Sequence, residues 1–148
     1  MRQPEFYAAV FGIIRNNEGK VLTIKRKNTG YSDGYYGLPA GHIEGIETPT
    51  ASLRREILEE VGLDVEEKDM KFLISGHRIS PQSDGSNRVY FDFYYEILRY
   101  SGTPINGEPE KSEGTYWINW KQETKIQFRE YLEQIELGNT YFEIDYRL

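Results

Sequence analysis

Residues 41–63 constrain the fold of this chain more than any other stretch, because they predict a loop that runs into a capped helix. Thr48 is a good N-cap residue, Pro49 suits the first helical position, and Gly62 can end the helix. Between these signals the helical period predicts an apolar stripe that faces a core, interrupted by the charge of Arg54. The stripe comprises Leu53, Ile57, Leu58 and Val61.

The other side of this helix is negatively charged. Glu56, Glu59 and Glu60 stand at positions i, i+3 and i+4, so their side chains share one face. Like charges at this spacing repel each other by about a few tenths of a kcal/mol per pair. A hard divalent cation with oxygen ligands would compensate this repulsion. A solvated acidic face with Arg55 as its ion partner explains the same spacing, and helix geometry alone does not choose between the two.

The order of residues in this stretch resembles the signature of the Nudix hydrolases, G-x5-E-x7-R-E-U-x-E-E-x-G-U, where U is a bulky aliphatic residue. A random chain would match these positions only about once in millions of trials. The family also commonly has an aromatic residue followed by Leu-Pro-Gly-Gly before the signature, and here Ala40 replaces the first of those glycines. The fixed positions are filled by Gly41, Glu47, Arg55, Glu56, Ile57, Glu59, Glu60, Gly62 and Leu63.

The resemblance implies roles for these residues. Glu56, Glu59 and Glu60 would hold Mg²⁺ or Mn²⁺, together with the backbone carbonyl of Ala40, which an alanine still supplies. Arg55 would orient a glutamate of the signature, a task that suits a guanidinium. The catalytic candidates are therefore Glu56, Glu59 and Arg55, and the sequence does not separate the general base from the metal ligands.

Residues outside the helix extend the candidate site. We expect Arg26, at the end of a strand, to bind substrate phosphates, and Tyr36 to stack on a base. An exposed strand end and a core or rim tyrosine are the alternatives. Glu47 is either a further metal-linked carboxylate or a favourable charge near a helix N-terminus. For four residues no strong role is predicted: loop carboxylates Glu108 and Glu110, a structural histidine His77, and Asn119, whose amide could read a base edge.

Size and composition favour one folded domain over residues 1–148. The net charge of −6 argues against an extended nucleic-acid surface, and an acidic protein would need metal ions to hold a polyphosphate. The absence of cysteine, of a signal peptide and of a long apolar run leads us to expect a cytoplasmic protein with no membrane segment. The apolar ending, residues 141–145, either packs back on the domain or meets a partner subunit, which leaves a homodimer open.

Strand and helix patterns alternate along the chain and predict a mixed α/β domain. We expect strands over residues 6–14, 70–75, 89–98 and 115–118, a strand over 21–25 that completes a hairpin with the first, a polar loop or hairpin over 76–88, and a second helix over about 123–137. The resemblance implies the more specific Nudix α/β/α sandwich, with a mixed sheet and the signature helix packed on it.

These expectations lead to one main functional hypothesis. A metal-dependent hydrolase would cleave a pyrophosphate linkage in a nucleotide substrate, most simply a nucleoside triphosphate to a monophosphate and pyrophosphate. ADP-ribose, nucleotide sugars and dinucleoside polyphosphates remain open as substrates. A nucleotide-sensing domain without catalysis is the alternative of another class, and the retention of every signature carboxylate counts against it.

Overall fold

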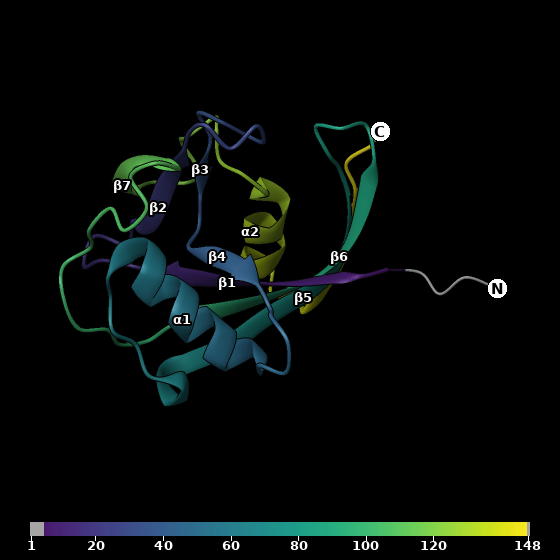
Figure 1. Cartoon of the computed structure of the whole chain (residues 1–148). Helices are drawn as coiled ribbons and strands as arrows, with labels where there is room; N and C mark the ends of the chain where they lie inside the picture. Colours follow the sequence, from purple (N-terminus) through teal and green to yellow (C-terminus); the bar gives the residue numbers. More distant parts are fainter. Residues whose placement is uncertain (1–4, 148) are drawn as a thin grey trace.

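The computed structural model describes residues 5–147, and a five-stranded mixed sheet forms its centre. Its strand order is β4-β1-β6-β5-β8, with β1 parallel to β6 and β5 parallel to β8. A second sheet, antiparallel, has the order β3-β2-β7 (Figure 1). The elements are β1 (Tyr7–Ile14), β2 (Val21–Arg26), β3 (Tyr36–Gly37), β4 (Ala40–His42), α1 (Pro49–Val61), a 3₁₀ turn (Glu67–Asp69), β5 (Met70–Pro81), β6 (Asn87–Ile97), β7 (Ser112–Ile118), α2 (Arg129–Glu136) and β8 (Tyr141–Asp145).

Helix α1 has the caps that the sequence predicts. The hydroxyl of Thr48 accepts a hydrogen bond from the backbone N–H of Ala51, and Gly62 ends the helix in the left-handed conformation. Leu53, Ile57 and Val61 of the predicted stripe are fully buried. Leu58 was predicted to join them, and that was wrong.

Leu58 is exposed because of its angular position around the helix axis. Leu58 is 56% exposed and lies one turn beyond Arg54, whose guanidinium pairs with Asp64 at 3.5 Å on the solvent side. The apolar stripe is therefore narrower than the sequence pattern implies.

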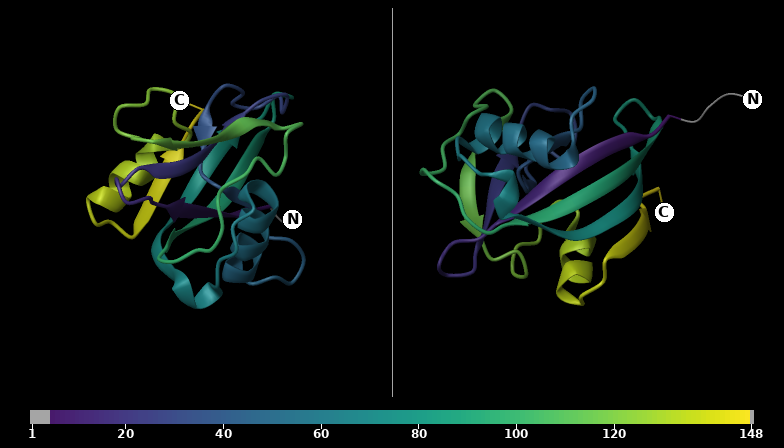
Figure 2. Two further views of the ribbon diagram at one scale, coloured as in Figure 1. Left: turned by 90° about the vertical axis from the view of Figure 1, so that its left-hand side faces the viewer. Right: turned by 90° about the horizontal axis from the view of Figure 1, so that it is seen from below.

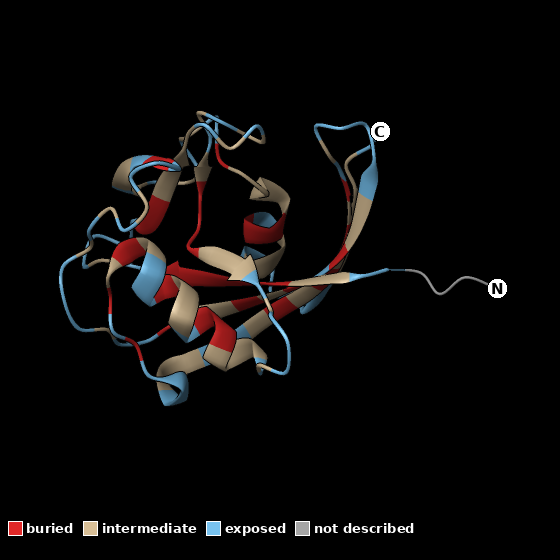
Figure 3. Cartoon of the chain, viewed as in Figure 1, coloured by how far each residue is buried: buried red, intermediate tan, exposed pale blue. Residues whose placement is uncertain are grey.

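The two helices cover opposite faces of the five-stranded sheet, which confirms the predicted α/β architecture with α1 packed on a mixed sheet (Figure 2). On the α1 face, strand β1 contributes Val10 and Ile14 to a core that the helix closes. On the other face, Phe11 and Ile13 of the same strand pack with Tyr94 and with residues of α2. The alternation along β1 therefore supplies both cores, which Figure 3 shows as the buried interior.

Three sequence predictions need correction, and one open alternative is decided. The hairpin of residues 6–25 forms only at the Arg15–Val21 bridge, because β1 and β2 then separate into different sheets. Residues 76–81, predicted as loop or hairpin, continue β5, and only residues 82–86 turn toward β6. The second helix is shorter than predicted, since residue 128 is left-handed and α2 begins after it. The C-terminal segment does pack back on the domain, as strand β8.

The topology sets the position of the candidate site. Strand β4 pairs antiparallel with β1, and the Gly12 amide donates to the Pro39 carbonyl. This places residues 39–42 beside the middle of α1, where the glutamates of the signature lie. No helix within residues 5–147 is both long enough and apolar enough to cross a bilayer.

Candidate active site

A polar cleft of about 650 Å³ opens between α1, strands β2 to β4 and the loop before β7. Its size is that of an ordinary small-molecule site. Glu56, Glu59 and Glu60 all line it, so the structure brings the predicted carboxylates to one cavity. Its other lining residues are Ile24, Arg26, Asn28, Thr29, Gly37, Leu38, Ala40, Glu44, Arg55, Glu108, Lys111, Ser112 and Gln127.

Glu60 is the most enclosed of these carboxylates. Its Oε1 accepts a hydrogen bond from the backbone N–H of Ala40 at 2.8 Å. Burial raises the pKa of the Glu60 carboxyl well above its usual range, and the nearby carboxylates of Glu56 and Glu108 raise it further. No basic side chain within residues 5–147 pairs with it, although Arg26 lowers its pKa slightly from a distance. A buried carboxylate without a paired cation is the condition that a bound metal ion would relieve.

Glu56 lies beside the glycine that opens the signature. A Cβ at Gly41 would overlap the carboxyl group of Glu56, so any side chain at this position would displace Glu56. Burial raises the pKa of Glu56, and the Arg55 guanidinium opposes that rise. Gly41 therefore permits the side chain of Glu56 to lie against β4.

Arg55 holds several acidic side chains in place. Its Nε and Nη2 donate to the two oxygens of Glu47, each at 2.9 Å, in a bidentate pair. Its Nη1 donates to Glu56 at 2.8 Å and lies 3.5 Å from a carboxylate oxygen of Glu59. The hydrogen bonds from Arg55 lower the pKa of Glu47 to about 2. Glu47 is thus an anchor for Arg55, and Arg55 links the loop to the glutamates of α1.

The donor set fits a hard cation, but it is not assembled around one point. Within residues 5–147 no three His, Cys, Asp or Glu side chains converge closely enough to chelate an ion. Glu59 is the outlying member, because its side chain is 55% exposed and points toward Arg55. Carboxylate oxygens on one face of a helix are nevertheless the ligand type that Mg²⁺ and Mn²⁺ prefer. Glu56, Glu59 and Glu60 could hold such an ion.

A fourth carboxylate reaches the cleft from outside the signature. Glu108 lines the cavity and raises the pKa values of both Glu56 and Glu60. The loop is tied to α1 because the Gly107 amide donates to the Glu60 carbonyl. Glu110, two residues on, is exposed and does not line the cleft. The sequence favoured a solvated loop charge for both, since spacing alone does not show which way a loop residue points.

The two predicted substrate-binding residues have different positions. Arg26 lines the cleft, and its Nε and Nη2 donate to the Tyr31 carbonyl and the Thr29 hydroxyl. The ring of Tyr36 lies outside the cleft, edge-on to Tyr116 with centroids 5.6 Å apart.

The remaining candidates lie away from the cleft. His77 contacts the ring of Phe91 on the sheet, and Asn119 borders a different hollow of the surface. Neither residue is among those that line the cavity.

Sequence reasoning missed a buried ion pair near the cleft. The Nε and Nη2 of Arg78 donate to the two oxygens of Asp92 at 2.7 and 2.9 Å. Both residues are buried, on neighbouring strands β5 and β6. Alternation with buried Ile74 and Tyr94 could have revealed them, had residues 76–81 been assigned to the strand. Gln127 was also missed, because its place in the cavity depends on the path of the chain after β7.

Comparison with known proteins decides the family. The NUDIX domain model matches residues 5–137. The chain belongs to the NUDIX family. This agrees with the signature in α1 and with the position of its carboxylates around one cleft.

Two curated relatives match part of this Nudix chain. It is 35% identical over 54 residues to an 8-oxo-dGTP diphosphatase of Proteus vulgaris, and 35% identical over 63 residues to a MutT-like protein of Streptomyces ambofaciens. These matches cover 36% and 43% of the chain, and 48% and 38% of those proteins. The chain thus matches less than half the length of either curated relative.

The fold of the Nudix chain is shared with solved structures. The MutT NUDIX hydrolase of Burkholderia pseudomallei superposes with a TM-score of 0.76 at 23% identity. The match covers 92% of this chain and the whole of the other. At this identity the likeness shows the fold alone, and it confirms the Nudix architecture that the signature implies.

Proposed function

We propose that the chain is a divalent-metal-dependent pyrophosphohydrolase that converts a nucleoside triphosphate and water to a nucleoside monophosphate and pyrophosphate. The observation that carries this proposal is the gathering of Glu56, Glu59, Glu60 and Glu108 around one cleft, where Glu60 accepts a hydrogen bond from the Ala40 amide and has no paired cation within residues 5–147. The similarity to an 8-oxo-dGTP diphosphatase supports a purine nucleoside triphosphate as substrate.

A bound Mg²⁺ would neutralise phosphate charge and acidify a water molecule. The chain's own residues have separate tasks in the proposal. Arg26 binds phosphate oxygens from the β2 side of the cleft, and Arg55 fixes Glu56. Glu59, which lines the cleft and is 3.5 Å from Arg55, would be a ligand of such an ion. A carboxylate of α1 or Glu108 accepts the proton of the attacking water as a P–O–P bond breaks.

The test is the formation of nucleoside monophosphate and the other cleavage products from a panel of nucleotides, measured by chromatography with Mg²⁺ and with excess EDTA. The panel contains the deoxynucleoside triphosphates, ADP-ribose, a nucleotide sugar and a dinucleoside polyphosphate. We expect Mg²⁺-dependent release of pyrophosphate from a triphosphate, with Glu59→Gln lowering the rate by about 10²-fold while the thermal transition persists. Binding of nucleotide without turnover across the panel would instead identify a sensor domain.

A further inference from the structure

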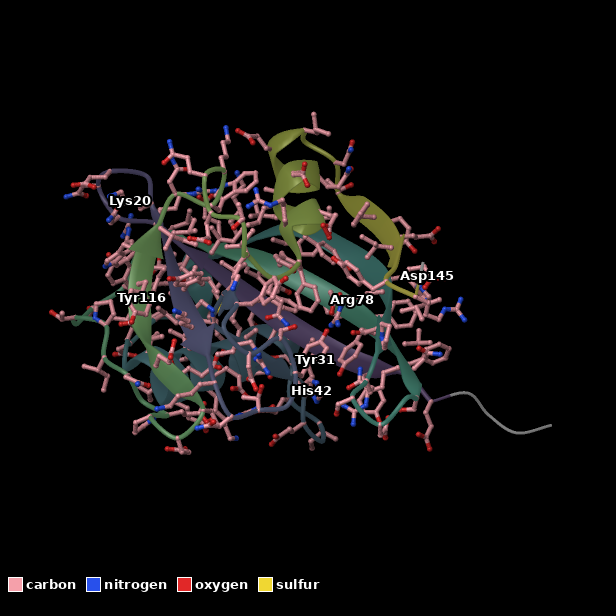
Figure 4. The ribbon with its side chains drawn as sticks, turned by 90° about the horizontal axis from the view of Figure 1, so that it is seen from above. Lys20, Tyr31, His42, Arg78, Tyr116 and Asp145 are labelled. Atoms are coloured by element: carbon pink, nitrogen blue, oxygen red, sulfur yellow. The ribbon has the colours of Figure 1, made fainter. Side chains whose placement is uncertain are left out.

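A second hollow of about 300 Å³ adjoins the cleft on the side of strands β5 and β6. Arg26, Ala40 and Gln127 line both cavities, so the two lie side by side. Figure 4 shows Arg78, Tyr31 and His42, all of which line it, in one region of the molecule. A nucleotide with its phosphates in the acidic cleft can therefore place its base in this base pocket, as we name the second hollow.

Arg78 is the most constrained polar residue of the base pocket. It is only 3% exposed, and Asp92, which is fully buried, accepts two of its hydrogen bonds and a third from the hydroxyl of Tyr131. The guanidinium carbon lies 3.9 Å from the ring centroid of Tyr90 and 4.3 Å from that of Phe128. These contacts fix both the position and the plane of the guanidinium.

One nitrogen of this guanidinium remains available to a ligand. The Nη1 of Arg78 has no hydrogen-bond partner within residues 5–147. In this part of the chain every fully buried side-chain nitrogen or oxygen has a partner, so Nη1 is not fully buried. Nη1 therefore keeps some solvent access, and the base pocket is a cavity that Arg78 lines. An arginine nitrogen can only donate, so it selects a ligand atom that accepts.

The turn at Gln127 and Phe128 lies beside this arginine. Phe128 has a φ of 58°, a left-handed conformation that is costly for a bulky residue. In that conformation its ring contacts Arg78, and the preceding residue, Gln127, lines both cavities. The strained turn therefore places the Phe128 ring against the guanidinium and Gln127 between the two cavities.

The charge of the surroundings indicates which acceptor fits. Asp92 already neutralises Arg78, so a neutral carbonyl oxygen satisfies Nη1 without a second full negative charge. No Asp or Glu lines the base pocket, so an exocyclic amino group would find no carboxylate there and would set a donor against Nη1. A base whose carbonyl oxygen faces Nη1 brings neither a second full negative charge nor an opposing donor next to the guanidinium.

We propose that Arg78 is a specificity-determining residue that donates from Nη1 to the carbonyl oxygen at position 6 of a purine or position 4 of a pyrimidine, and so selects bases with a carbonyl there over bases with an amino group there. The inference rests on the proposed hydrolysis of nucleoside triphosphates. It selects hypoxanthine or guanine over adenine, and uracil over cytosine. The charged side chain of Arg88, at the rim, bonds the Tyr90 hydroxyl and has no part in this selection.

The test compares dITP with dATP, which differ chiefly in a carbonyl or an amino group at position 6. For the unaltered protein we expect kcat/KM to be about tenfold or more higher for dITP. Arg78→Gln/Asp92→Asn replaces the ion pair by two amides, so no buried charge is left unpaired, and the ratio should fall to about one. Arg88→Gln is the matched control: it removes a charge from the same pocket and should lower both rates while preserving the ratio.

A second measurement separates this inference from the proposed function. Binding of dIMP and dAMP, measured by calorimetry without metal, should show the same preference even if no nucleotide is hydrolysed. If triphosphates are hydrolysed but dITP and dATP react within about twofold of each other, the specificity role is wrong and the hydrolase stands. The specificity role of Arg78 would also be wrong if the double variant kept the preference. The same holds if inorganic phosphate alone displaced dIMP from the base pocket.

Discussion

The carboxylate of Glu60, on α1, accepts a hydrogen bond from the backbone amide of Ala40, on β4, at 2.8 Å. This bond fastens the strand that leads into the signature to the helix that follows it. Alanine is tolerated where the family commonly has glycine because Ala40 is not among the residues with positive φ, so its Cβ causes no backbone strain. The same bond holds the Glu60 carboxyl group at the wall of the cleft.

The enclosure of Glu60 predicts a stability gain when its charge is removed. Glu60→Gln keeps an oxygen for the Ala40 amide and abolishes a buried carboxylate, so in EDTA at about pH 8 we expect the free energy of unfolding to rise by about 1 kcal/mol or more. For a chain of this size that corresponds to a Tm increase of about 2–4 °C. Differential scanning calorimetry would measure it. Mg²⁺ should raise the Tm of the unaltered protein and not that of the variant. A Tm of Glu60→Gln below that of the unaltered protein in EDTA would contradict the assignment of Glu60 as a destabilising carboxylate that binds metal.

The same residue predicts a pH dependence of definite sign. The folded-state pKa of Glu60 is raised above the ordinary value of 4.5, so its stabilising contribution is complete below pH 4.5 and is lost as pH rises through the folded pKa. Glu47, with a pKa lowered to about 2, acts in the opposite direction and only in strong acid. In EDTA, the Tm difference between Glu60→Gln and the unaltered protein should therefore widen from about pH 5 to pH 8. A difference that stays constant over this range would exclude titration of Glu60 as the cause.

Arg55 and its neighbour Arg54 provide a matched pair of substitutions. Arg55→Lys keeps the charge but cannot reproduce the bidentate bond to Glu47 together with the bond to Glu56, so kcat/KM should fall by about 10–100-fold. Arg54→Lys alters an exposed residue paired with Asp64 at 3.5 Å, and activity should not change. Steady-state kinetics on the preferred nucleotide would decide, and equal losses in both variants would show that Arg55 has no special role.

Glu108 and Glu110 test the contribution of the loop before β7. Glu108 faces the cleft and Glu110 faces solvent, although they are two residues apart. We expect Glu108→Gln to lower kcat by about tenfold or more and to raise the Mg²⁺ concentration needed for half-maximal rate, while Glu110→Gln changes neither. Activity measured over a Mg²⁺ titration makes the comparison. If Glu108→Gln changed neither kcat nor the Mg²⁺ dependence, Glu108 would be an ordinary solvated loop charge.

Predictability from the sequence differs between local and long-range features. The ends of α1 were predictable because Thr48, Pro49 and Gly62 act within one or two turns of their own position. The turn at residues 16–19 was likewise predictable, but whether the flanking strands stay paired depends on β7, nearly a hundred residues away, which pairs with β2. Local sequence signals thus predict the helix and the turn, but they do not predict which strands pair in the sheets.

The candidate site divides in the same way. Three glutamates at helical spacing share a face in any helix, so their meeting in the cleft was predictable. The Arg78–Asp92 pair was not, because Gly76, Pro81 and nearby turn residues made the end of β5 resemble a loop. Burial of that strand end depends on packing with α2 and β8, which the local composition does not encode.

Gly41 supplies the sharpest test of how the signature glycine works. Its backbone φ is not in the left-handed region, so alanine would cause no backbone strain there. The methyl group of Gly41→Ala would instead overlap the carboxyl group of Glu56 and displace it from Arg55 and the cleft. We expect kcat/KM to fall by about 10-fold or more, as for other disturbed metal ligands, while the circular dichroism spectrum is preserved. Gly37→Ala is the control on the other side of the cleft, since its methyl group would meet only the flexible end of Gln127. If Gly41→Ala keeps full activity, the Glu56 carboxylate does not need its observed position, and its assignment as a metal ligand fails.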